Sequence, residues 1–289
     1  MKIPAKIELI EVGPRDGLQN EPQPISAQNK KELIRRLAEA GVSRMETAAF
    51  VSPKWVPQMA DAEEISAYCQ ELGITYIALT PNTLALNRAI AAHVPQIAVF
   101  IGASTAFNQK NINKTTAESL RDCEAIFAGA KARGMFIRAY VSMAFTCPFQ
   151  GEVSFAEVNH VCQRFAELGA DEIDIADTNG HANPIMVYDR FSRLRDLYPE
   201  MPFVGHFHDT WKMALANALA AMQAGVDRFD SSIGGLGGCP YSPGATGNLA
   251  SEDLLLMLTQ MGIETGIDYS KLSAVSPYAR SLSGRFSSP

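Results

Sequence analysis

The sequence predicts an α/β protein, a single (β/α)₈ (TIM) barrel that spans residues 1–289. Short β-branched and apolar runs alternate with longer segments of helical period, and eight such units follow one another without a break in rhythm. No Pro/Ser-rich linker divides the chain. An open doubly wound sheet is the alternative, but it usually carries a GxGxxG turn after its first strand. Here VGPRDGLQNEPQP follows the first strand, so the barrel is favoured.

The expected elements follow from hydrophobic pattern and from the position of glycine. In chain order, the expected strands are residues 7–12, 44–49, 75–80, 96–101, 136–143, 171–176, 202–208 and 227–233. Apolar side chains recur at helical spacing between them, most clearly in residues 28–40 and 155–168. Helical segments end before the next strand at Gly41, Gly73, Gly134, Gly169 and Gly225, as expected of left-handed C-caps. The last stretch, 271–289, is expected to be partly disordered.

Composition excludes several classes of protein. The chain is 47% hydrophobic and 19% charged with a net charge of −6, which is not the composition of a disordered chain. Its basic residues are scattered, which argues against a nucleic-acid partner. No apolar run is long enough to cross a membrane, and the N-terminus does not resemble a signal peptide. Five cysteines without a CxxC spacing indicate a reduced, cytoplasmic protein.

Polar residues fall where a barrel enzyme carries its chemistry, at the C-terminal ends of the strands and in the loops that follow. Listed by successive strand ends, these residues are Arg15, Asp16, Glu46, Asp177, His206, His208, Cys239 and Asn248. Because the C-terminal ends of parallel strands share one rim, we expect these side chains to converge there.

His206 and His208 give the sharpest signal. They alternate on one strand, so both imidazoles face the same side, with Asp16 on the same rim. Two histidines, an aspartate and an amide oxygen suit Mn²⁺, Mg²⁺, Co²⁺ or Zn²⁺ in an open site. The alternative is a pair of polar residues satisfied by hydrogen bonds at a strand end.

The acidic and basic residues of the rim each allow two interpretations. Arg15 could stabilise a developing oxyanion, or it could form a surface ion pair with Asp16 in a turn. Glu46 could orient Arg15 or form a structural salt bridge. Asp177 could support a histidine or bind substrate, or it could make an Asx turn before the next helix.

The glycine-rich segment 234–248 follows the last expected strand. Such a loop is mobile or lets the backbone approach a ligand closely, and Gly238 is the expected contact to substrate. Cys239 lies within this segment. A single cysteine is usually an inert small hydrophobe, but above an active site it could transfer a proton or respond to oxidation.

Four stretches resemble the hydroxymethylglutaryl-CoA lyase family, a member of the DRE-TIM metallolyases. They are VGPRDGLQNE (12–21), ETAAFVSPKWVPQMAD (46–61), GHFHDT (205–210) and GGLGGCPYSPGATGNLASED (234–253). The resemblance runs to about residue 269. It implies a (β/α)₈ barrel, bound Mg²⁺ or Mn²⁺, and cleavage of a 3-hydroxy-3-methylglutaryl thioester into acetyl-CoA and acetoacetate.

The resemblance also implies roles for individual residues. By motif position, the metal ligands are Asp16, His206, His208 and Asn248. Asp16 or His206 would accept the substrate proton. Arg15 matches the catalytic arginine, Cys239 the loop cysteine, and Glu46 and Asp177 the active-site acids. The implied partner is an acyl-CoA thioester, and a homodimer is expected at the level of the family.

Departures from the family pattern leave the substrate open. The family usually reads DTIG and HDTYGQALAN, where this chain has DTNG, followed by His181, and HDTWKMALAN. We expect Asn179, His181 and Lys212 to recognise the acyl tail. Citramalyl-CoA, a longer branched 3-hydroxyacyl-CoA and a CoA-independent aldol substrate remain alternatives.

The other functions considered are a Claisen-type synthase, which carries further domains, and a catalytically silent barrel kept as a binding protein. Coenzyme A binding has no clear sequence signature. Lys54, Lys110 and Lys114 could meet its phosphates, although for each of them a solvated surface lysine is the alternative.

Overall fold

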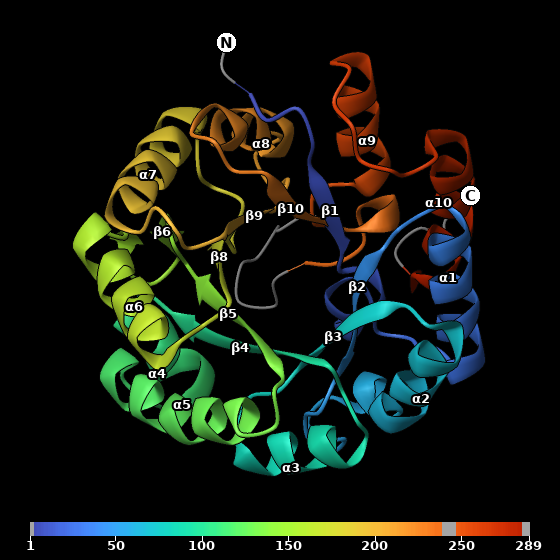
Figure 1. Cartoon of the computed structure of the whole chain (residues 1–289), viewed down its shortest axis with the longest axis horizontal. Coiled ribbons are helices and arrows are strands. Elements are labelled where there is room, and N and C mark those ends of the chain that lie inside the picture. The colour runs from blue at the N-terminus through green and yellow to red at the C-terminus, as the bar shows by residue number, and fades with distance from the viewer. Residues whose placement is uncertain (1–2, 239–246, 285–289) are drawn as a thin grey trace.

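The structure is a computed structural model, which describes residues 3–238 and 247–284. Eight parallel strands close into a barrel in the order β1-β10-β9-β8-β5-β4-β3-β2, which confirms the predicted fold class (Figure 1). The strands are β1 (Glu8–Glu11), β2 (Arg44–Ala49), β3 (Thr75–Leu79), β4 (Gln96–Gly102), β5 (Phe136–Ser142), β8 (Glu172–Asp177), β9 (Phe203–Phe207) and β10 (Arg228–Ser231). Each lies within one of the eight expected segments or extends past it by a single residue.

Helices surround the barrel on the outside (Figure 1). They are α1 (Ala27–Glu39), α2 (Ala62–Leu72), α3 (Thr83–Ala91), α4 (Thr105–Ile112), α5 (Thr116–Lys131), α6 (Phe155–Leu168), α7 (Pro184–Leu197), α8 (Ala214–Gln223), α9 (Ser251–Gln260) and α10 (Tyr269–Leu282). The five glycines expected after helical segments all have φ between +65° and +96°, a conformation that glycine adopts without the strain of a Cβ atom.

The first part of the C-terminal segment 271–289 is helical. Residues 271–282 belong to α10, and residues 285–289 lie outside the described residues, so partial disorder of this segment stays a prediction. Helix α10 begins at an Asp268 cap and buries Leu272, Val275 and Ala279, next to α1 and α9. This apolar face is hard to recognise from the sequence, because the helix contains Pro277 and the chain ends in the polar stretch LSGRFSSP.

A small antiparallel hairpin of β6 (Thr146–Cys147) and β7 (Gly151–Glu152) interrupts the strand–helix alternation. Buried Arg190 on α7 fixes both ends of this hairpin by donating hydrogen bonds to the carbonyl oxygens of Ala144 and Val153. Such a short pair of strands carries no hydrophobic period, so the sequence pattern does not predict it. No helix among the described residues is both long and apolar enough to span a membrane.

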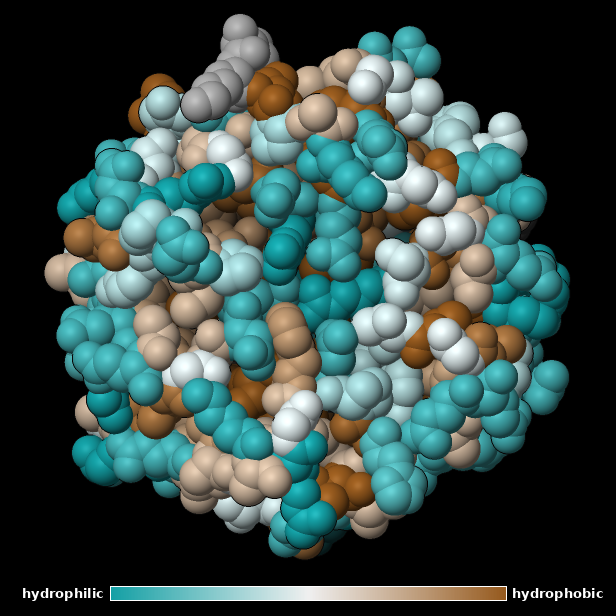
Figure 2. Space-filling view, viewed as in Figure 1, coloured by the Kyte–Doolittle hydropathy of each residue, from teal (hydrophilic) through white to brown (hydrophobic). Residues whose placement is uncertain are grey.

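The inside of the barrel carries charge, and the apolar side chains of the strands face the helices. On β8, Ile173 and Ile175 belong to the hydrophobic core, whereas Glu172 and Asp174 alternate with them and pair with arginine. At the N-terminal end of the barrel, Arg44 donates hydrogen bonds of 3.0 and 2.7 Å to Glu172. Figure 2 shows hydrophilic residues gathered at the centre of the viewed face.

Glu11, at the end of β1, joins the beginning of the barrel to its last part. Its carboxylate accepts hydrogen bonds from the backbone N–H groups of Gly13 (2.8 Å) and Ile233 (2.9 Å) and from the Ser251 hydroxyl (2.6 Å). These partners lie in η1 (Gly13–Gly17), η3 (Ile233–Gly235) and α9. Burial raises the pKa of Glu11 to about 7, against the opposing effect of the three hydrogen bonds.

This raised pKa predicts how stability depends on pH. The folded carboxyl keeps its proton up to about pH 7, whereas the unfolded one loses it near 4.5, so the contribution is complete below pH 4.5 and is lost as the pH rises through 7. As the pH rises from 5 to 8, the unfolding free energy of the wild-type protein should fall by on the order of 3 kcal/mol more than that of a Glu11→Gln variant, which lacks this titration. Urea unfolding of both proteins measures this, and a pH-independent difference between them would contradict it.

Candidate active site

The turn after β1 places Arg15 and Asp16 at the C-terminal end of the barrel. It forms the π-helical turn η1, and its first and last residues are glycines. A Cβ atom on Gly13 would lie 2.5 Å from the Glu11 carboxylate, and one on Gly17 would lie 2.8 Å from the Ser232 hydroxyl. Glycine at these two positions therefore lets the turn pack against β1 and the end of β10.

Arg15 lies between two carboxylates. It donates a hydrogen bond of 2.8 Å to Asp16 and forms an ion pair with Glu46, which is fully buried at the irregular part of β2. Burial disfavours the guanidinium charge, but Glu46 and Asp16 raise the pKa of Arg15 above its usual value. Burial also disfavours ionised Asp16, but Arg15, together with two nearby histidines, lowers its pKa to about 2. At neutral pH the site therefore holds a fixed cation beside an ionised carboxylate.

His206 and His208 meet Asp16 across the barrel opening. The two imidazole centroids are 5.1 Å apart, and one potential ligand atom from each of the three residues lies within 4.8 Å of the others. The Nδ1 atom of His206 is 2.9 Å from the Asp230 carboxylate, and that of His208 is 3.2 Å from the Asp177 carbonyl oxygen. Both partners only accept hydrogen bonds, so Nδ1 carries a proton in each ring and Nε2 is the atom available to a metal. Burial disfavours a charged imidazole and lowers the pKa of His208 to about 4, but the Asp230 carboxylate raises the pKa of His206 to about 9, so a metal must displace a proton from its Nε2.

Asn248 completes a donor set that fits a divalent cation. Its Nδ2 donates hydrogen bonds to Asp16 (2.8 Å) and to the Leu236 carbonyl oxygen (3.1 Å). Its Oδ1 is buried and has no hydrogen-bond partner among the described residues. A buried amide oxygen normally has a partner, and a cation beside Asp16, His206 and His208 would provide one.

A cavity of about 200 Å³ lies in front of these groups. Its charged and titratable lining residues are Arg15, Asp16, His206 and His208. The rest of the lining is mixed and includes apolar Leu79, Phe100, Phe107 and Ala176 and polar Gln19, Asn20, Asn111, Ser142 and Thr178. A small ligand with one charged or oxygen-rich end and one hydrocarbon branch fits such a mixed lining.

Asp177 and Asn179 are buried but do not line this cavity among the described residues. The Asp177 carboxylate accepts hydrogen bonds of 3.1 Å from the backbone N–H groups of His181 and Ala182, four and five positions further on. It therefore holds the loop before α7, but not by an Asx turn, in which the bond goes to the residue two positions on. Burial raises its pKa to about 7. Asn179 accepts a hydrogen bond of 2.9 Å from Thr146, so it holds the β6–β7 hairpin.

The lysines named from the sequence are exposed: Lys54, Lys110, Lys114 and Lys212. Lys114 pairs with Asp122, and Lys212 pairs with Asp209. None of these lysines lines the cavity in the described part of the chain. His181 stacks on Trp211, with ring centroids 4.1 Å apart, so two of the departures from the family pattern contact each other.

Gly238 lies at the cavity, where its carbonyl oxygen accepts a hydrogen bond of 3.1 Å from Asn20. This bond joins the glycine-rich segment to the turn after β1. Cys239, for which a proton-transfer role is predicted, lies outside the described residues.

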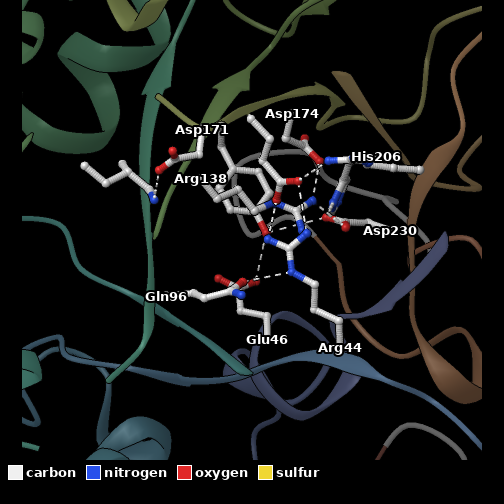
Figure 3. A network of polar contacts seen from close by, with 12 residues as sticks. Arg44, Glu46, Gln96, Arg138, Asp171, Asp174, His206 and Asp230 are labelled. Carbon is white, nitrogen blue, oxygen red and sulfur yellow. Dashed lines mark hydrogen bonds and ion pairs between the residues drawn. The ribbon is translucent and has the colours of Figure 1, made fainter. Parts of the chain in front are cut away.

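Sequence reasoning missed a layer of polar side chains directly below the histidines. Arg138, Tyr140, Asp174 and Asp230 are buried inside the barrel (Figure 3). Strand alternation is the signal that could have found them. In IRAYVS (137–142) the polar residues Arg138 and Tyr140 alternate with apolar ones, and in EIDIAD (172–177) Glu172 and Asp174 do the same, so each pair faces the side away from the helices. The Tyr140 hydroxyl donates to Glu46 (3.1 Å) and lies 3.5 Å from Asp230.

Comparison with known proteins identifies the family. A family model described as HMGL-like matches residues 6–278, which is most of the chain. The chain belongs to the HMGL-like family. Within that family, it is 45% identical over 271 residues to the mitochondrial hydroxymethylglutaryl-CoA lyase of Homo sapiens, covering 93% of this chain and 83% of the human protein.

Two bacterial members of the HMGL-like family are also similar. The 3-hydroxy-3-isohexenylglutaryl-CoA/hydroxymethylglutaryl-CoA lyase of Pseudomonas aeruginosa is 42% identical over 269 residues, covering 93% of this chain and 90% of that protein. A structure of a hydroxymethylglutaryl-CoA lyase from Acinetobacter baumannii, in complex with coenzyme A and 3-methylmalate, superposes with a TM-score of 0.91 at 37% identity. The superposition covers 96% of this chain and 91% of that one.

The donor set predicts a measurable loss of metal binding. His208→Ala removes one proposed ligand, and we expect the affinity for Mn²⁺ to fall by at least about tenfold. His160→Ala, which removes an exposed histidine on α6, should leave the affinity unchanged. Titration of free Mn²⁺ by electron paramagnetic resonance compares the variants. Equal affinities of His208→Ala and His160→Ala would exclude His208 as a ligand.

Proposed function

We propose that the protein is a metal-dependent carbon–carbon lyase that cleaves 3-hydroxy-3-methylglutaryl-CoA into acetyl-CoA and acetoacetate. The observation that carries this proposal is that Arg15, Asp16, His206 and His208 converge on one cavity. Family membership supports it, because curated relatives at 40–45% identity are named hydroxymethylglutaryl-CoA lyase. Mg²⁺ or Mn²⁺ would be held by Asp16, His206, His208 and Asn248.

The reaction has two chemical demands. A tertiary hydroxyl must lose its proton, and the thioester enolate that leaves must be stabilised. A bound divalent cation supplies Lewis acidity toward the substrate hydroxyl and fixes its orientation. Asp16 is the proposed proton acceptor, and it lines the cavity. His206, the other predicted acceptor, has no free ring nitrogen while Nε2 binds the metal and Nδ1 keeps the proton that it donates to Asp230.

Arg15 meets the second demand. It keeps its positive charge, lines the cavity, and is held by Glu46 from behind, so its guanidinium is oriented before any enolate forms. A preoriented cation at the position of developing negative charge is the arrangement that stabilises an oxyanion most strongly. We propose that Cys239, on the glycine-rich segment that begins at this cavity, helps to protonate the acetyl-CoA enolate.

The acyl branch of the substrate is the main alternative within this function. The apolar part of the cavity lining could take a methyl group, as in the first substrate, or a longer branch. The name of the Pseudomonas aeruginosa relative includes both a methyl and an isohexenyl branch. Citramalyl-CoA would require the same chemistry. We propose that Asn179, His181 and Lys212 distinguish these tails, although none of them lines the cavity among the described residues.

The partner that we propose is an acyl-CoA thioester, and the structure of a relative in complex with coenzyme A supports it. The surface lysines Lys54, Lys110 and Lys114 remain candidates for its phosphates. A cytoplasmic homodimer is proposed at the level of the family. No role in binding nucleic acid or a membrane is proposed.

The test of this function is an assay on metal-depleted protein, with and without Mg²⁺ or Mn²⁺. Release of acetyl-CoA is followed with 3-hydroxy-3-methylglutaryl-CoA, citramalyl-CoA and a 3-isohexenyl analogue. We expect metal-dependent cleavage, with the highest kcat/KM for the first compound. A higher value for another thioester would keep the mechanism and change the substrate. Metal binding without cleavage of any thioester would overturn the lyase proposal and favour a CoA-independent aldolase.

Removal of the Arg15 charge should affect turnover more than binding. Arg15→Met is expected to lower kcat by about 10²–10³-fold, because the enolate then lacks its oriented cation. Arg133→Met, at an exposed position after α5, is the matched control and should retain normal turnover. Steady-state kinetics on 3-hydroxy-3-methylglutaryl-CoA measures both. Near-normal kcat in Arg15→Met would show that the enolate role is wrong.

A further inference from the structure

Two carboxylates lie under His206, and only one of them bonds to it. Asp230 on β10 is the register partner of His206 on β9, and its Oδ2 is 2.9 Å from the imidazole Nδ1. Asp174 on β8 also lies close: one oxygen or ring nitrogen atom of each of these three residues lies within 4.8 Å of those of the other two. The Asp174 side chain accepts a hydrogen bond from Arg138 and not from His206.

A guanidinium, and not a second metal ion, occupies the space between these carboxylates. The Nη2 atom of Arg138 donates hydrogen bonds of 2.5 Å to Asp230 and 2.8 Å to Asp174 (Figure 3). All three side chains are fully or almost fully buried. The cation that balances the two acids is therefore part of the chain, and the Asp174–His206–Asp230 group needs no ion.

Arg138 gives the Asp230 carboxylate a direction. One oxygen, Oδ1, accepts from Arg138, and the other, Oδ2, accepts from His206. Arg138 is itself held in place, since it bonds to Asp174 and its guanidinium lies over the Tyr140 ring, 4.8 Å from the centroid. The carboxylate thus has a fixed donor on each side.

We propose that Asp230 is a positioning residue for His206, and that Arg138 sets the orientation in which Asp230 does this. The inference rests on the proposed metal site. Asp230 keeps the proton of His206 on Nδ1 and so leaves Nε2 free as the ligand atom. Asp174 is buried to the same extent but does not bond to His206, so it should not have this role.

The Arg138 bond makes the effect of one substitution specific. In Asp230→Asn, Arg138 continues to require an acceptor and draws the amide oxygen toward itself. The amide NH₂ then faces His206 and donates to Nδ1, which must lose its proton. The proton moves to Nε2, the atom that should bind the metal.

The experiment compares Asp230→Asn with Asp174→Asn, which makes the same carboxyl-to-amide change at a neighbouring buried residue. Affinity for Mn²⁺, measured by electron paramagnetic resonance, should fall by about 10–100-fold in Asp230→Asn and by much less in Asp174→Asn. A second readout is the nitrogen-15 spectrum of the histidine side chains, of which the chain has five. In Mg²⁺, His206 should carry its proton on Nδ1 in the wild-type protein and on Nε2 in Asp230→Asn.

A double variant covers the case in which a single buried substitution prevents folding. Asp230→Asn with Arg138→Gln removes one charge of each sign, and the introduced glutamine amide can still donate a hydrogen bond to Asp174, which would otherwise lose its partner. The double variant also frees the asparagine amide to turn its oxygen toward His206, so the affinity for Mn²⁺ should recover to within about tenfold of wild type, since the bond to the ligand is restored.

Each outcome decides the inference. The expected tautomer change, or recovery in the double variant, supports it. Unchanged Mn²⁺ affinity in Asp230→Asn, an equal loss in Asp174→Asn, or no recovery in the double variant would overturn it while leaving the proposed lyase intact. A wild-type protein that binds no Mn²⁺ would overturn both the metal site and this inference.

Discussion

The rest of the site depends on the pairing of the buried Arg138 guanidinium with two carboxylates at the centre of the barrel. A guanidinium that is shut off from water requires acceptors, and Asp174 and Asp230 supply them at 2.8 and 2.5 Å. Those acids would in turn repel each other without it. Its Nε and Nη1 atoms have no hydrogen-bond partner among the described residues, so the compensation is electrostatic more than geometric. The interior is therefore polar because each charge there requires another.

This interior network connects the two halves of the chemistry. One half is Arg15 with Glu46, and the other is His206 with Asp230. The Tyr140 hydroxyl lies between them, 3.1 Å from Glu46 and 3.5 Å from Asp230, while its ring forms part of the cavity wall. The cation proposed to stabilise the enolate and the histidine proposed to bind the metal thus share one buried set of hydrogen bonds. A change in one half is expected to be felt in the other.

The sequence predicted the fold and the rim of the site well, because both depend on local signals. Alternating periods gave the eight strands, and the ends of those strands contain Arg15, Asp16 and His206. What it could not give is which polar residues face one another across the barrel. Arg138 on β5 and Asp230 on β10 are separated by 92 positions in the chain, and only the closed sheet brings them together. Asn179 failed to reach the cavity for a similar reason, since a short hairpin that carries no periodic pattern takes up its side chain.

The hydrogen bonds that close the site also dictate when it can exist during synthesis. Asp16 and Asn248, which bond to each other, are separated by 232 positions in the chain, and Glu11 and Ser251 by 240. The first strand and its turn can make only their local bonds, from Gly13 to Glu11 and from Arg15 to Asp16, until almost all of the polypeptide has left the ribosome. Contacts of such long sequence separation make folding slow and leave strand edges exposed meanwhile. Nascent chains that stop before α9 would contain all eight barrel strands but would lack the bond from Ser251 to Glu11. We expect such chains to bind chaperones.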